Sequence, residues 1–154
     1  MKIRKIGKPQ RRDFIDLLLL GDEQIEMVER YLDEGEMFVL YEGNIPVSAS
    51  IVIEIGTRTF EIKNIATWPQ YQGKGYGTAL LSYIAEYYNP HADVLYVGTG
   101  NNQRTLNFYK HAGFSFSHIV KDFFLENYDH PIFEDGNQLI DMIYLKKVLT
   151  SSSE

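Results

Sequence analysis

Three glycines occupy every second position in the segment QGKGYG, residues 72–77, between an apolar run and a helical pattern. Gly73, Gly75 and Gly77 leave the backbone bare where an extended segment turns into a helix. Such a turn presents main-chain amides at the positive end of the helix dipole, which suits an anion such as a pyrophosphate. Side chains there would block the approach of phosphates, so glycine is the useful residue. A glycine-rich turn that binds nothing is the alternative.

Two other phosphate-binding motifs do not match this segment. A Walker loop needs Ser or Thr directly after its Gly-Lys pair, and here Lys74 lies between two glycines with no such residue following. The dinucleotide fingerprint fails because the spacing is G-x-G-x-G and no acidic residue ends a strand about 20 residues later. The remaining interpretation is a strand-to-helix turn that holds an anion.

The rest of the chain alternates between strand and helix patterns, without an internal repeat. Leu80, Leu81, Ile84 and Tyr88 form one helical stripe, and the turn EGNIP separates two β-rich runs as in a hairpin. The expected strands are 2–6, the two arms of the hairpin within 36–55, 58–66, 93–100, 114–125 and 138–148. The expected helices are 10–20, 23–33, 75–88 and a segment from an Asn cap at 102 to a stop at Gly113, and residues 126–137 are expected to form a loop.

Length and composition favour one globular domain. The chain has 154 residues, of which 44% are hydrophobic, so residues 1–150 are expected to share one core and residues 151–154 to form a frayed tail. It contains no cysteine, which excludes disulfides, thiolate metal sites and a cysteine nucleophile. No histidine pair has the spacing of metal ligands, so no metal is expected.

Charge and hydropathy limit the partners. Fifteen basic against 21 acidic residues give a net charge of −6, which argues against nucleic acid and favours a cationic partner. The N-terminal segment lacks a signal-peptide core, and the longest apolar run, at 17–20, is far too short to span a bilayer. We therefore expect a soluble cytoplasmic protein with no membrane partner.

Two segments resemble motifs of one enzyme family. The first has Gln or Arg, two residues, Gly, one residue, then Gly or Ala, and the second has an Asn early in a helix, a Tyr seven residues later and a Gly-Phe pair. The matching residues are Gln72, Gly75 and Gly77 in the first segment and Asn102, Tyr109, Gly113 and Phe114 in the second. With both motifs in order, the chain resembles the GCN5-related N-acetyltransferases, the GNAT family, over most of its length. The segments GTGN and DHPIFEDG further resemble an uncharacterised bacterial subgroup of that family.

The resemblance implies a fold and a cosubstrate. The fold would be α+β in three layers, a mixed and mostly antiparallel sheet of roughly seven strands with helices on both faces. A splayed pair of parallel strands would hold acetyl-CoA, with the pyrophosphate on the glycine turn and the thioester near the amide of Ile65, which would stabilise the oxyanion. For Asn102, contact with the pantetheine arm and capping of its helix are equal alternatives. The residues expected at acetyl-CoA are Ile65, Ala66, Thr67, Gln72, Gly73, Lys74, Gly75, Tyr76, Gly77, Thr78, Asn102 and Tyr109.

The resemblance also implies N-acetyl transfer by direct attack of an amine on the thioester, in a ternary complex. Tyr109 would protonate the departing thiolate, with a place in the core as the alternative. Glu61 would take the proton of the incoming ammonium, directly or through water, with a solvated strand carboxylate as the alternative. His130, in the final loop, is a further candidate for substrate contact. A protein that keeps the CoA cleft for sensing or interaction without turnover is the alternative function.

The acceptor is expected to be a primary amine on a cationic small molecule or a peptide. Eleven of the 21 acidic residues fall in two segments that wall the acceptor side of this fold, and their field would attract a cation. The alternative is that these acids lie on solvated helix faces and only keep the protein soluble. Polyamines, aminoglycosides, amino acids and peptides all stay open as acceptors, as does the oligomeric state, with a homodimer among the alternatives. The eleven acids are Asp22, Glu23, Glu26, Glu29, Asp33, Glu34, Glu36, Glu126, Asp129, Glu134 and Asp135.

Overall fold

The structure, a computed structural model, describes residues 1–22 and 24–149. The expected tail at 151–154 and the acidic residue Glu23 lie outside the described residues. A seven-stranded sheet runs through the molecule in the order β1-β2-β3-β4-β5-β9-β6, antiparallel everywhere except between β4 and β5. Its strands are β1 (Lys2–Ile6), β2 (Glu36–Glu42), β3 (Ile45–Gly56), β4 (Thr59–Thr67), β5 (Val94–Thr99), β6 (Ser115–Val120) and β9 (Met142–Val148).

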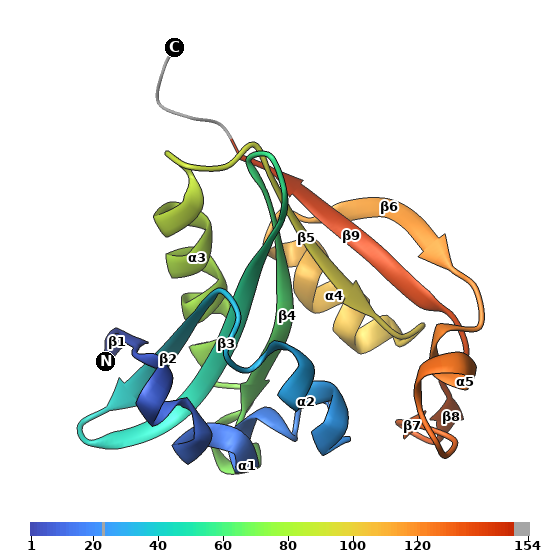
Figure 1. Ribbon diagram of the computed structural model, residues 1–154, viewed down its shortest axis with the longest axis horizontal. Coiled ribbons are helices and arrows are strands. Elements are labelled where there is room, and N and C mark those ends of the chain that lie inside the picture. The colour runs from blue at the N-terminus through green and yellow to red at the C-terminus, as the bar shows by residue number, and fades with distance from the viewer. Residues whose placement is uncertain (23, 150–154) are drawn as a thin grey trace.

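Helices cover both faces of this sheet (Figure 1). On one face lie α1 (Ile15–Leu18) and α2 (Ile25–Tyr31), and on the other lie α3 (Tyr76–Tyr88) and α4 (Gln103–His111). The shorter elements are the 3-10 helices η1 (Lys8–Phe14) and η2 (Pro69–Tyr71) and the helix α5 (Phe123–Asn127). The three-layer mixed fold expected from the family resemblance is therefore confirmed.

Strand β2 shows why the sheet needs cover on both sides. Met37 and Val39 pack with the α1 and α2 cluster, while Phe38 and Leu40 pack with the α3 and α4 cluster. All four side chains are fully buried, because successive side chains of the strand point to opposite faces of the sheet and each face is covered by a hydrophobic core. A continuous apolar run is the sequence signature of such a strand.

The pair β4 and β5 opens partway along its length. The two strands pair in parallel only from Thr59–Ile62 against Val94–Val97. On its other side β4 carries a bulge at Lys63, because Ile51 faces Asn64 while Val52 faces Ile62. Beyond Ile62 the β5-facing edge of β4 is therefore left without a strand partner in the described chain, which confirms the expected splayed pair.

The segment from residue 114 to the last strand differs from expectation. The strand expected at 114–125 ends at Val120, because Asp122 adopts a left-handed conformation and the apolar residues after it form α5. The last strand begins at Met142 and not at 138. The loop expected at 126–137 instead begins with the end of α5 and runs into a hairpin of β7 (Phe133–Glu134) and β8 (Asn137–Gln138). A small core of its own holds this insertion together, formed by Phe124, Ile132 and Leu139.

The sequence carried a signal for this hairpin. Asp135 and Gly136 have φ values of +52° and +82°, as in the tight turns that Asp-Gly pairs favour in two-residue hairpin loops. The flanking strands are only two residues long, so no alternating pattern marked them. The signal was thus present in the turn and missing from the strands.

The first two predicted helices are shorter than expected. Residues 8–14 form a 3-10 helix with Pro9 in its first turn, which leads into one turn of α-helix, and the second helix covers 25–31. Buried Arg11 holds the first segment in place, because its guanidinium donates hydrogen bonds to backbone carbonyls of residues 6, 32, 34 and 35. The predictions for 2–6, the hairpin within 36–55, 58–66, 75–88, 93–100 and the helix capped at 102 are confirmed to within a residue or two.

Candidate active site

The glycine turn forms a cradle at the N-terminus of α3. Gly75 is the N-cap residue, with φ of +89°, and Gly73 has φ of +74°. The first helical bond runs from the amide of Ala79 to the carbonyl of Gly75, so the amides of residues 76–78 have no acceptor within the helix. A Cβ at either glycine would meet nothing within 4 Å. These two glycines are thus required by the backbone conformation, and the space beside them is open.

The third glycine has another role. A Cβ on Gly77 would lie 3.1 Å from Cζ of Phe108, a residue of α4. The tight contact favours a glycine where α3 packs on α4. Gly77 thus serves helix packing through its missing side chain, and its backbone amide is still one of the three free amides of the cradle.

The side chains of the turn support it. Gln72 donates a hydrogen bond through Nε2 to the carbonyl of Thr67, at 3.0 Å, and so ties the turn to the end of β4. Lys74 lies with Nζ 5.8 Å from the centre of the Tyr71 ring, and the hydroxyl of Tyr76 donates to Glu42. Gln72 thus positions the cradle, and Lys74 is a cation close to it.

An outer cleft of about 350 Å3 runs from this cradle to the open edge of β4. Nine of the predicted acetyl-CoA residues line it together with Tyr109, while Lys74 and Asn102 do not. Sequence reasoning missed Arg104, Thr105 and Phe108, which follow the predicted Asn102 on the same helix and also line the cleft. The nine are Ile65, Ala66, Thr67, Gln72, Gly73, Gly75, Tyr76, Gly77 and Thr78.

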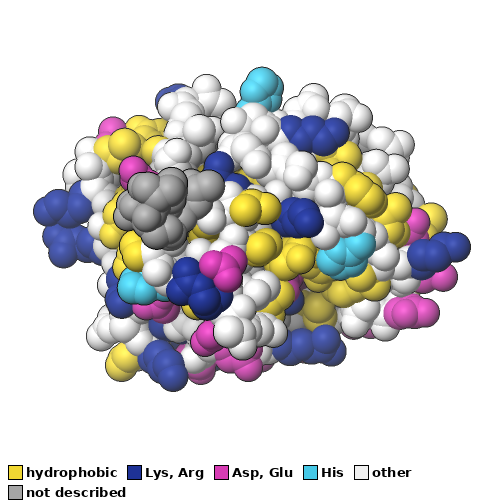
Figure 2. Space-filling view, turned by 90° about the horizontal axis from the view of Figure 1, so that it is seen from above, with side chains coloured by type: hydrophobic (Ala, Val, Ile, Leu, Met, Phe, Trp, Pro, Cys, Tyr) yellow, Lys and Arg dark blue, Asp and Glu magenta, His cyan; other side chains and the backbone are white. Residues whose placement is uncertain are grey.

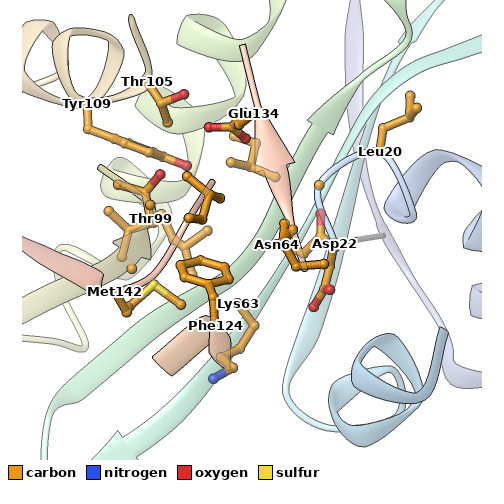
Figure 3. A pocket seen from close by; sticks show the side chains of 18 of the residues that line it. Leu20, Asp22, Lys63, Asn64, Thr99, Thr105, Tyr109, Phe124, Glu134 and Met142 are labelled. Carbon is orange, nitrogen blue, oxygen red and sulfur yellow. The ribbon is translucent and has the colours of Figure 1, made fainter. Parts of the chain in front are cut away.

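An inner cavity of about 260 Å3 lies beyond the outer cleft (Figure 3). The α1–α2 connection, β4, β5, α4 and the insertion at 121–141 all contribute to its walls. Ile65, Thr105 and Tyr109 line both the outer cleft and the inner cavity. The two spaces therefore meet at these three residues.

Tyr109 belongs to the core and to the site at once. Its side chain is only 6% exposed, and its ring contacts Phe108 and Phe114 edge to face. Burial, followed by the charge of Glu134, raises the pKa of its phenol, so the hydroxyl stays protonated at neutral pH. Figure 3 shows the ring pointing into the inner cavity. Within residues 1–22 and 24–149 the hydroxyl makes no hydrogen bond, so it is available as a donor there.

Asn102 caps its helix. Its Oδ1 accepts hydrogen bonds from the amides of Arg104 and Thr105, and its Nδ2 donates to Asp135 at 2.7 Å. Of the two alternatives for this residue, capping is the one that the structure shows. Arg104 also pairs with Asp135, so the start of α4 holds the turn of the β7–β8 hairpin. Contact of Asn102 with pantetheine stays a prediction.

Glu61 lies away from the junction of the two spaces. It is 8% exposed and lines a neighbouring cavity of about 250 Å3 beneath α2, with Lys63 Nζ at 3.5 Å. Burial and the charge of Glu61 raise the pKa of the adjacent Tyr144 to about 12. The bulge at Lys63 explains the position, because it places Glu61 and Ile65 on opposite faces of β4. The role of Glu61 as the base stays a prediction.

The fold places only some of the predicted acidic residues at the inner cavity. Glu29 pairs with Arg12, and Glu36 accepts hydrogen bonds from Lys5 and Tyr88, and neither glutamate lines the inner cavity. On the end of the molecule seen in Figure 2, acidic and basic side chains are intermingled. Among the residues that the structure describes, the acids lining the inner cavity are Asp22 and Glu134. His130 is exposed and does not line it.

Asp22 is held by two phenols. Its Oδ1 accepts a hydrogen bond from Tyr128 at 2.8 Å, and its Oδ2 accepts one from Tyr31 at 3.3 Å. Asn64 donates to the carbonyl of Leu18 and to the Tyr31 oxygen, so the Tyr31 hydrogen is directed toward Asp22. Burial raises the pKa of Asp22 above its ordinary range. This network fixes the α1–α2 connection on β4 and was not foreseen from the sequence.

In the described part of the chain, none of the helices is long and apolar enough to cross a membrane. Within the same residues, no group of three or more His, Asp or Glu side chains is placed to hold a metal ion.

Comparisons with known proteins agree with this geometry. The family model described as acetyltransferase (GNAT) domain matches residues 33–116. The chain is 36% identical, over 92% of its length and 92% of the relative, to the uncharacterized N-acetyltransferase YvbK of Bacillus subtilis (strain 168).

Two solved structures extend the comparison. An IAA acetyltransferase from Bacillus cereus ATCC 14579 matches with a TM-score of 0.90 and 33% identity, over 96% of this chain and 99% of that one. A GNAT family acetyltransferase from Elizabethkingia anophelis with acetyl-CoA bound matches with a TM-score of 0.89 and 34% identity, over 96% and 97%. Both similarities span almost the whole of each chain.

Proposed function

Because the chain belongs to the GNAT family and is an acyltransferase, we propose that it moves an acetyl group from acetyl-CoA to a primary amine. The observation that carries the proposal is the meeting of the outer cleft and the inner cavity at Ile65, Thr105 and Tyr109. One space is open to a long cosubstrate and the other to an acceptor, and the reacting atoms would lie between them.

The outer cleft fits acetyl-CoA. The relative from Elizabethkingia anophelis binds this molecule, and the cleft here offers free amides at residues 76–78 for a pyrophosphate. Lys74 and Arg104 would add positive charge near the phosphates. The unpaired edge of β4 at Ile65–Thr67 would hydrogen-bond the pantetheine arm as a neighbouring strand would.

The junction supplies groups for acyl transfer. The thioester carbonyl would accept a hydrogen bond from the amide of Ile65, which stabilises the negative charge of the tetrahedral intermediate. Tyr109 would donate its proton to sulfur as the carbon–sulfur bond breaks. Its raised pKa keeps the phenol protonated until negative charge develops on the sulfur.

The incoming ammonium must also lose a proton before nitrogen can attack. Glu61, the base predicted from the sequence, lines the neighbouring cavity and would reach this proton only through water. Acidic groups at the inner cavity favour a cationic acceptor, and its small volume favours a small molecule over a peptide. The proposal includes a cytoplasmic setting, which the lack of cysteine accommodates.

A thiol-release assay tests the proposal. Purified protein is mixed with acetyl-CoA and a panel of polyamines, aminoglycosides, amino acids and peptides, and free CoA thiol is followed against a control without amine. We expect amine-dependent release, fastest with a cationic acceptor. Thermal stabilisation by acetyl-CoA without release for any amine would instead favour the non-catalytic binding module.

A further inference from the structure

One carboxylate oxygen of Glu134 lacks a hydrogen-bond donor in the described part of the chain. Its Oε1 is buried and has no hydrogen-bond partner within residues 1–22 and 24–149, and the side chain lines the inner cavity. A buried carboxylate oxygen without a donor is costly, so native structures supply one from protein, water or ligand. The oxygen thus indicates a missing donor at this wall of the cavity.

The other groups on the cavity wall do not supply that donor. Asp22 is an acid whose two oxygens already hold the phenols of Tyr31 and Tyr128. Lys63, the cation among the described lining residues, pairs with Glu61, and Figure 3 shows it at the opposite end of the cavity from Glu134. Among the described residues, the cavity wall therefore has a free acidic oxygen on Glu134 and no cation beside it.

Glu134 lies at the end of the cavity where transfer would occur. Figure 3 shows its carboxylate at the same end of the cavity as Thr105 and Tyr109, two of the three residues shared with the outer cleft. The charge of Glu134 also contributes to the raised pKa of Tyr109, which places the two groups within electrostatic reach. A cation bound by Glu134 would stand beside the proposed thioester position.

The backbone holds Glu134 in this position. It directly precedes the Asp135-Gly136 turn, and Asp135 is bound by Asn102 at 2.7 Å and by Arg104 at 3.2 Å. Those two residues begin α4, the helix that also carries Tyr109. The proton acceptor and the proton donor would therefore be fixed relative to each other through one helix.

We propose that Glu134, in place of Glu61, binds the ammonium group of the acceptor and takes its proton, an inference that rests on the proposed acetyl transfer. The acceptor class is a primary alkylamine, because apolar side chains line the same cavity for the carbon chain. Glu134 first takes one ammonium proton and passes it to water, which leaves a neutral amine. As the nitrogen–carbon bond forms and the carbon–sulfur bond breaks, the nitrogen loses a second proton to the carboxylate and the Tyr109 proton passes to sulfur. The Glu134 proton then returns to the phenolate, directly or through water. The apolar residues are Phe124, Ile132, Leu139 and Met142.

The test uses Glu134→Gln, which keeps the shape of the side chain and removes the charge. With the best amine of the panel, kcat/KM at neutral pH should fall about 100-fold, and kcat should recover partly as pH rises and free amine accumulates. Glu54→Gln, an exposed glutamate on β3, is the matched control and should behave as wild type. Glu61→Gln should have a much smaller effect than Glu134→Gln.

Stability separates this role from a structural one. Replacing a carboxylate whose Oε1 is buried without a partner should leave the melting temperature unchanged or raise it, and the acetyl-CoA thermal shift should persist. If the glutamine variant folds poorly, Glu134→Asp keeps the charge and should retain part of the activity with the wild-type pH profile. Wild-type kcat/KM and pH profile in Glu134→Gln would overturn the inference alone. No turnover of any amine by wild type would overturn the proposed function.

Discussion

Replacing Gly75 with alanine tests the cradle most directly. At φ of +89° an alanine is strained, and the open space around its Cβ means that strain is the main cost. A left-handed conformation costs a non-glycine residue about 1–2 kcal/mol. For a chain of this length that lowers Tm by about 2–8 °C in the unliganded protein.

The effect on acetyl-CoA should be larger than the effect on the fold. With acetyl-CoA at about 100 times its Kd, wild type gains about 2.7 kcal/mol, or about 5–11 °C in Tm. A methyl group in the cradle lies where the phosphates would approach, and even a tenfold loss of affinity removes about 1.4 kcal/mol of this gain. We expect the thermal shift of Gly75→Ala to fall to half or less.

Gly43→Ala is the matched control. Gly43 also has a left-handed backbone, with φ of +59°, and an added Cβ there meets nothing within 4 Å. It lies in the β2–β3 turn and does not line the outer cleft. The control should lose a similar amount of intrinsic stability and keep the whole ligand shift. A full shift in Gly75→Ala, or an equal loss in both variants, would refute the cradle.

Three further variants address the site. Tyr109→Phe should keep Tm because the ring packing remains, while kcat falls about 100-fold or more and acetyl-CoA affinity changes little; an unchanged kcat under chemistry-limited turnover would return Tyr109 to the core. Asn102→Ala should lose about 1 kcal/mol of stability from the missing cap and raise KM for the amine. Asn102→Ser should restore Tm without restoring KM, since serine caps the helix but does not reach Asp135. Equal restoration of Tm and KM would contradict a role of the Asn102–Asp135 bond in holding Glu134 at the cavity. Burial raises the pKa of Asp22, so its protonated form is favoured by folding and wild type loses stability as pH rises through that pKa. Asp22→Asn lacks this loss, so its Tm relative to wild type should increase from pH 4 to pH 8, and a difference that stays constant with pH would exclude the effect.

The parts of the site that could be predicted from sequence are those with local signals. The cradle follows from glycines at a strand-to-helix junction, the cap from Asn102 before a helical stripe, and the buried stripe of α3 from its periodicity. Each depends on residues within a turn or two of one another, where backbone conformation and side-chain spacing decide the outcome. Family motifs then placed Tyr109 at the site.

The acceptor side could not be predicted in the same way. Asp22 and Glu134 looked like two of eleven similar acids, and what separates them is which segments meet across the inner cavity. Glu134 reaches the cavity because a short hairpin docks on the start of α4 through Asp135. The hydrogen-bond partners of Asp135 are Asn102, 33 positions earlier in the chain, and Arg104, 31 positions earlier. Long-range packing of this kind leaves no periodic pattern in a sequence.

The two faces of β4 show most clearly which features the sequence determined and which the tertiary structure decided. The sequence by itself determined that residues 58–66 form a strand leading into the cradle, because an apolar run and bare glycines are local properties. Strict alternation would then put Glu61 and Ile65 on one face, but the single extra residue at Lys63 moves them to opposite faces. That bulge arises from the pairing of β4 with β3 while β5 departs after Val97, so only the assembled sheet decided which carboxylate lies near the proposed thioester.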